Sequence, residues 1–233
     1  MSLLWTMTGL LTGVLLSPVL RGQISLHSVP TDSPWRTNCP SCDRSTLLIG
    51  VTGRCRGCRM RLGPPPFSVE LIAAGALGLL ATLIHDPLPL LAFGWIAAVG
   101  VVLAFVDVAV HRLPDRLTFA AFGGALPLLA IADLRRAAWA LVGAIALGAV
   151  YLLLVVTNPG GMGLGDAKLA LCLGLALGWY GWVAVIYGAC AGFLLAGLYA
   201  LILLALRKVT RKDSLAHGPF MLLGALAALA LLV

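Results

Sequence analysis

Two acidic residues, Asp107 and Asp166, stand in or at the end of long apolar segments. A carboxylate at membrane depth costs about 2.5–3.5 kcal/mol on insertion scales, and acids kept there are commonly functional. Paired aspartates can hydrolyse a peptide bond without a metal, because one carboxylate activates water while the other donates a proton. The two residues therefore predict a catalytic carboxylate pair whose members meet at the same membrane depth.

The surroundings of each aspartate suggest its role. Asp166 follows Gly163 and Gly165 and opens an apolar helix, whose N-terminal dipole favours an ionised carboxylate and the role of base. Asp107 stands near a helix C-terminus, where the dipole favours the protonated form and the role of acid. His111 is expected one turn beyond Asp107, where a charged imidazole would oppose that assignment. Simple capping of its own helix is the alternative reading of Asp166.

Four cysteines form two Cys-x-x-Cys motifs, in the order Cys39, Cys42, Cys55 and Cys58. This spacing indicates one tetrahedral four-thiolate site, usually occupied by zinc. Four thiolates leave no open ligand position, so the predicted zinc is structural and folds a loop that has few large apolar residues.

The composition requires a membrane. The chain has 233 residues, of which 61% are hydrophobic and 11% charged, which excludes an ordinary soluble domain. The predicted fold is an all-α polytopic membrane protein with about eight transmembrane helices and a small cytoplasmic zinc-binding loop. The expected spans are 3–20, 67–84, 88–110, 116–132, 136–156, 167–184, 186–206 and 217–232.

The predicted organisation has three parts: a first transmembrane helix at 1–20, the cysteine loop at 21–66, and a seven-helix membrane core at 67–233. The first segment is expected to be retained, because no basic residue precedes its apolar run.

The chain has a net charge of +7, and the positions of its basic residues follow the predicted membrane topology. Alternating the eight spans places fourteen of the sixteen Lys and Arg residues on one side, in loops 21–66, 111–116, 157–168 and 207–216. The positive-inside rule makes these loops cytoplasmic and places both termini outside. The basic charge thus indicates membrane topology and contact with the lipid bilayer, and no nucleic acid partner is expected.

Three further polar residues have simpler alternatives. Glu70 would be a first-turn acid of the second span, and Asp115, after Pro114, a helix N-cap. Lys168 stands two positions after Asp166, off its helix face, and could reach the headgroups or pair with an acid of a substrate.

These motifs together resemble the prepilin leader peptidases, membrane aspartyl proteases of the Gly-x-Gly-Asp type. The resemblance extends over nearly the whole chain. It rests on the double Cys-x-x-Cys loop, residues 69–71, Asp107 with the following 113–115, residues 163–168, and residues 218–220 before the last span.

The resemblance implies that Asp107 and Asp166 are the catalytic pair, with Asp115 the less favoured partner. It implies type IV prepilin or pseudopilin precursors as substrates, each cut after a short basic leader on the cytoplasmic side of the bacterial inner membrane. Many members also methylate the new N-terminus with S-adenosylmethionine, and Glu70 lies in a segment linked to that activity. Residues 17–21 depart from the family's pattern, which leaves methylation open.

Two other classes of protein remain as alternatives. An ion- or proton-coupled transporter would explain the membrane acids but not the cysteine motifs, and the chain shows no convincing inverted repeat. A zinc-stabilised membrane scaffold for a secretion or pilus assembly would explain the arginine-rich loop but give the Gly-x-Gly-Asp turn no role.

Overall fold

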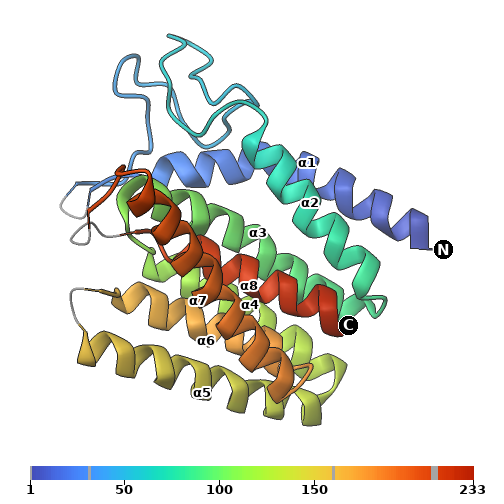
Figure 1. The fold of residues 1–233 in the computed structure, drawn as a ribbon. Coiled ribbons are helices and arrows are strands. Elements are labelled where there is room, and N and C mark those ends of the chain that lie inside the picture. The colour runs from blue at the N-terminus through green and yellow to red at the C-terminus, as the bar shows by residue number, and fades with distance from the viewer. Residues whose placement is uncertain (1, 31–32, 159–160, 211–214) are drawn as a thin grey trace. The chain divides into compact units, whose positions relative to one another are not determined.

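The computed structural model describes residues 2–30, 33–158, 161–210 and 215–233, which contain eight α-helices and no β-strand (Figure 1). Two of the basic residues counted above, Arg211 and Lys212, lie outside these ranges. The chain divides into a first unit, Met1–Pro114, and a second, Asp115–Val233. The helices are α1 (Ser2–His27), α2 (Ser68–Leu83), α3 (Pro87–Val110), α4 (Asp115–Ala132), α5 (Leu134–Thr157), α6 (Leu164–Gly178), α7 (Trp182–Ala205) and α8 (Gly218–Leu232).

The all-α fold is confirmed, and one helix corresponds to each expected span. Within the described ranges, five helices, namely α1, α3, α4, α5 and α7, are long and apolar enough to cross a membrane. The other three have 15 or 16 residues. A membrane protein therefore fits the structure, while eight complete crossings remain a prediction.

Two expected boundaries were wrong. The first helix continues to His27 instead of ending at residue 20, so residues 21–27 are helical and do not belong to the loop. The sixth helix ends at Gly178 instead of residue 184. The next helix starts at Trp182, after Gly181 adopts a φ of 106° that a side chain would disfavour.

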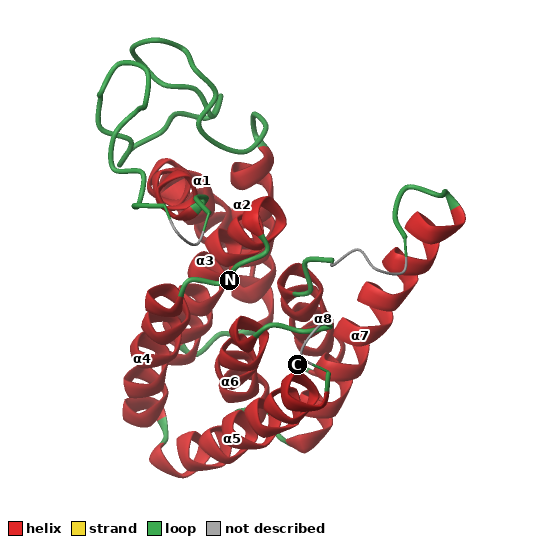
Figure 2. Ribbon diagram, turned by 90° about the vertical axis from the view of Figure 1, so that its left-hand side faces the viewer, coloured by secondary structure: helices red, strands yellow, loops and turns green. Residues whose placement is uncertain are grey.

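In the first unit, α1 and α2 lie side by side and meet through small residues (Figure 1). A Cβ added to Gly13 would come within 2.5 Å of the Ala74 backbone, so only glycine permits this approach. The segment between the two helices contains no helix in its described part and appears as loops in Figure 2. Its small core consists of Cys39, Ile49, Cys55 and Leu62.

In the second unit, α5 packs along α6 and α7 packs along α8 (Figure 2). Glycines again form the contacts. A Cβ on Gly174 of α6 would lie 2.6 Å from the carbonyl oxygen of Gly143 in α5, and one on Gly224 of α8 would lie 2.4 Å from the Gly192 nitrogen in α7. α6 also contacts α4, α7 and α8. The central helix of this unit is therefore the one that begins with the Gly-x-Gly-Asp turn.

Candidate active site and metal centre

The four cysteines of the loop are brought together as predicted. Their Sγ atoms all lie within 4.8 Å of one another, with 3.5 Å separating Cys39 from Cys58 and Cys42 from Cys55. Zn–S bonds of about 2.3 Å in a tetrahedron would place the sulfurs roughly 3.8 Å apart. The cluster therefore fits one tetrahedral metal ion. No open ligand position remains for chemistry, which favours a structural ion.

The local backbone explains why these thiols suit a metal. Amide hydrogen bonds from Cys58 and Gly57 lower the pKa of the Cys55 thiol to about 6, and the Gly57 nitrogen lies 3.4 Å from that sulfur. The Arg44 amide also lowers the pKa of Cys42, but hydrogen bonding to the neighbouring thiols and burial together raise it to about 11. The second motif thus favours the thiolate form that metals bind.

Asp166 is the third residue of α6 and is only 8% exposed. Its Oδ2 accepts a hydrogen bond of 3.1 Å from the Gly163 N–H, while Gly165 lies in the same first turn. The helix-capping contact considered for Asp166 is therefore present. Capping uses only part of the hydrogen-bonding capacity of Asp166, since the two oxygens of a carboxylate offer about four acceptor positions.

Asp107 lies in the last turn of α3 and is 5% exposed. The helix ends at Val110, and His111 adopts a left-handed conformation with a φ of 50°. His111 therefore stands one turn beyond Asp107, and its N–H donates to the Asp107 carbonyl oxygen at 2.8 Å, but its own backbone is no longer helical. Asp107 lies in the first unit and Asp166 in the second, and their pairing stays a prediction from the sequence.

Asp115 and Lys168 form an ion pair that the sequence did not predict. Lys168 Nζ lies 2.6 Å from Asp115 Oδ1, joining the start of α6 to the start of α4 just after Pro114. This contact within the chain adds to the two expected roles of Lys168, reaching the headgroups or meeting a substrate acid, which stay predictions. The Asp115 side chain is 59% exposed, so the pair contributes about 0–1 kcal/mol to stability.

Arg21 is the polar residue that the sequence analysis misplaced. It is fully buried in α1, and its Nε and one terminal nitrogen donate to the two carboxylate oxygens of Glu70 at 2.8 and 2.6 Å. The same guanidinium donates to the carbonyl oxygens of Pro64 and Pro65 at 3.1 and 3.0 Å. Both oxygens of Glu70 are thus bound by Arg21. The expected part of Glu70 in S-adenosylmethionine binding and methylation stays a prediction.

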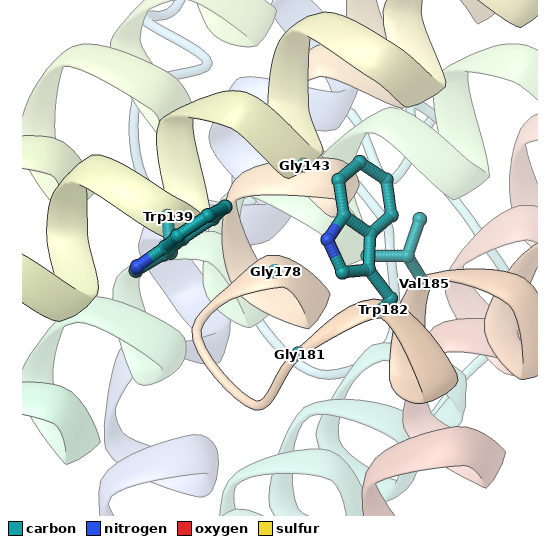
Figure 3. A pocket seen from close by; sticks show the side chains of 6 residues that line it. All are labelled: Trp139, Gly143, Gly178, Gly181, Trp182 and Val185. Carbon is teal, nitrogen blue, oxygen red and sulfur yellow. The ribbon is translucent and has the colours of Figure 1, made fainter.

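A small cavity lies at the far end of α6 from Asp166. Its volume is about 80 Å³, and in Figure 3 the rings of Trp139 and Trp182 lie on either side of Gly178. Gly143, Gly181 and Val185 complete the lining. Gly178 stands twelve positions after Asp166 in α6, which is roughly 18 Å along a helix. The cavity therefore does not belong to the candidate active site.

These features define a class: an all-helical protein with membrane-spanning helices, a loop-borne four-cysteine cluster, and single carboxylates buried in two apolar helices. Residues 93–201 match the profile of the type IV leader peptidase family, and the chain belongs to that family. The resemblance seen in the sequence is confirmed. The matched range includes Asp107, Asp115, Asp166 and Lys168 but not the cysteine cluster.

Several relatives carry the name prepilin leader peptidase/N-methyltransferase. The relative from Aeromonas salmonicida is 28% identical over 211 residues, covering 83% of this chain and 70% of that protein. The one from Burkholderia pseudomallei strain K96243 is 32% identical over 221 residues, covering 83% and 66%. The one from Dichelobacter nodosus is 32% identical over 161 residues, covering 59% and 53%. No solved structure matches the chain.

Proposed function

We propose that this protein is an aspartic endopeptidase that removes the short basic leader of type IV prepilin or pseudopilin precursors. Asp107 and Asp166 are the proposed catalytic pair. The observation that carries the proposal is the burial of both carboxylates, at 5% and 8% exposure, in apolar helices inside the range matched by the peptidase family. Buried carboxylates of this kind are costly, and a role in chemistry explains why they are retained.

In the proposed mechanism, the ionised Asp166 accepts a proton from water while the water oxygen attacks the carbonyl carbon of the scissile bond. The protonated Asp107 then donates its proton to the leaving amine as the C–N bond breaks. The Gly163 N–H and the N-terminal dipole of α6 both stabilise a charge on Asp166, which supports its role as base. The two carboxylates would titrate as a coupled pair.

Carboxamide variants of each aspartate test the proposal. Asp107→Asn and Asp166→Asn keep side-chain size but remove acid and base function, so each should lower cleavage of a prepilin precursor by a factor of about 10² or more. Asp86→Asn is the matched control, since this exposed aspartate occupies the N-cap position of α3 without a side-chain capping hydrogen bond. The measurement is appearance of the shortened pilin with detergent-solubilised protein, and size-exclusion chromatography confirms folding. Full cleavage by either active-site variant would refute the proposed pair.

The same assay separates the alternative functions. A transporter or a membrane scaffold would yield no shortened product from any variant, whereas a peptidase yields one from the wild type and from Asp86→Asn. The family match favours the peptidase.

The cysteine cluster is proposed to hold structural zinc, since its four thiolates fit tetrahedral coordination. A bound ion would stabilise the loop fold and complete its small core. The peptidase chemistry proposed above uses only carboxylates and water.

N-methylation by S-adenosylmethionine is proposed as a second activity, because the relatives named above carry both activities in their names. Transfer of a labelled methyl group to the cleaved pilin would support it. Normal cleavage without transfer would leave a protease alone.

The proposed location is the bacterial inner membrane, with the cysteine loop and the active site facing the cytoplasm and both termini outside. The basic loops and the prepilin peptidase family support this orientation. Accessibility of single introduced cysteines to an impermeant reagent would test it.

A further inference from the structure

Three aromatic rings, from α5, α7 and the residue that precedes α8, meet in the second unit. Tyr151 of α5 stacks on Phe193 of α7, with ring centroids 5.3 Å apart. His217, which immediately precedes α8, lies 5.1 Å from Phe193 and 5.9 Å from Tyr151, measured between the same points. None of the three residues belongs to a motif that the sequence revealed.

The polar atoms of this cluster also meet. Tyr151 Oη lies 3.4 Å from His217 Nε2, and Tyr151 is only 1% exposed. A buried phenol hydroxyl usually has a hydrogen-bond partner, and this imidazole supplies one. Gly148, one turn before Tyr151 in α5, packs against the first turn of α6, since an added Cβ would lie 3.8 Å from the carbonyl oxygen of Ala167, the residue after Asp166. This packing brings Tyr151 and its partner His217 close enough for the charge of Asp166 to act on both. Among the described residues, the titratable groups near His217 are thus Tyr151 from α5 and Asp166 from α6, while α7 contributes an apolar ring.

The backbone packing explains how the rings reach one another. Gly192 of α7 has Met221 backbone atoms of α8 at 3.3 Å from the position of an added Cβ. This close crossing brings the start of α8 against Phe193, the residue that follows Gly192. On the other side, α5 packs along α6, the helix that carries Asp166.

We infer that Tyr151 and His217 form a polar pair that positions the Asp166 carboxylate and sets its protonation for hydrolysis. The inference rests on the proposed function and adds two positioning residues to it. Hydroxyl and imidazole dipoles act strongly in a low-dielectric interior, and oriented donors favour the charged form of a nearby carboxylate. Phe193 holds both rings in place and contributes no polar atom.

Two variants test the inference while preserving the packing. Tyr151→Phe removes one hydroxyl, and His217→Phe keeps a ring against Phe193 while removing both ring nitrogens. The control is Tyr187→Phe, because Tyr187 is 56% exposed on α7. We expect each test variant to lower kcat for prepilin cleavage about tenfold with KM little changed, as for loss of one functional hydrogen bond. The acidic limb of the pH–activity profile should move to higher pH by roughly half a unit, and the control should match the wild type.

The outcomes are distinct. A displaced acidic limb together with lower kcat in the test variants, and neither in the control, supports the inference. Wild-type kcat and pH profile in both variants would overturn it. So would an equal loss of activity at every pH with lower thermal stability, which marks a purely structural role. Cleavage by Asp166→Asn would instead refute the proposed function itself, independently of Tyr151 and His217.

Discussion

Removing the guanidinium of Arg21 should be among the most damaging single substitutions in the first unit. Arg21 is fully buried and donates four hydrogen bonds, two to Glu70 and one each to the carbonyl oxygens of Pro64 and Pro65. Arg21→Met fills similar space but leaves the Glu70 carboxylate, 7% exposed, without its counter-ion. The contact also attaches the end of the cysteine loop to α1 and α2.

The expected magnitude follows from the burial of both partners. Breaking a buried ion pair by removing one member costs about 3–5 kcal/mol, because the remaining charge is left uncompensated. For a chain of this size each kcal/mol lowers the unfolding midpoint by about 2–4 °C, so the predicted decrease is about 6–20 °C. Replacing both partners by apolar residues removes the stranded charge and can be nearly neutral. The double variant Arg21→Met with Glu70→Leu should therefore be more stable than Arg21→Met alone.

Thermal unfolding in detergent, followed by the loss of monodisperse protein, measures these differences. The control is Arg136→Met, because Arg136 forms an exposed pair with Asp133 at 3.7 Å and such pairs contribute about 0–1 kcal/mol. An Arg21→Met protein that unfolds at the same temperature as Arg136→Met would refute the reasoning. So would a double variant that is less stable than Arg21→Met.

Two other predictions concern packing and the metal. Gly174→Ala should lower the unfolding midpoint, because its Cβ would lie 2.6 Å from the Gly143 carbonyl oxygen. Gly197→Ala is the control, because a Cβ there meets open space and its unfolding midpoint should equal or exceed that of the wild type. A Gly174→Ala protein as stable as Gly197→Ala would contradict this packing. Elemental analysis should find one zinc per chain. A strong chelator should remove this zinc and expose the segment between α1 and α2 to proteolysis. Unchanged proteolysis after metal removal would show that the cluster does not support the loop.

Local patterns predicted the helices and the cysteine cluster, because both depend on residues close together in the chain. Apolar runs located every helix, and two Cys-x-x-Cys motifs predicted one site. Helix ends were less predictable. The apolar run stopped at Leu20, so Arg21 was assigned to a loop, although a charged residue can continue a helix when a partner such as Glu70 compensates it inside.

Pairs between distant positions could not be predicted from spacing. Arg21 and Glu70 are 49 positions apart, and Tyr151 and His217 are 66 apart. Whether two such residues come into contact depends on which helices are neighbours and how those helices are shifted along their axes. The close glycine contacts between helices determine both. One signal was present in retrospect: Arg21 and Glu70 are opposite charges at facing ends of the two helices that enclose one loop.

Helix length offers a physical reason for the depth of the candidate site. α6 and α8 each have 15 residues, which is roughly 22 Å of helix, whereas the hydrocarbon core is about 30 Å thick. In the predicted topology, the turn between α6 and α7 lies at the outer interface, where the half-exposed Trp182 is favoured. The missing helix length then lies at the N-terminal end of α6, which predicts that Asp166, in the first turn, lies inside the apolar layer. α8 is equally short and runs in the same predicted direction, which predicts a similar depth for His217. A short helix would thus bring the proposed catalytic carboxylate to the depth at which the apolar segment of the proposed substrate begins.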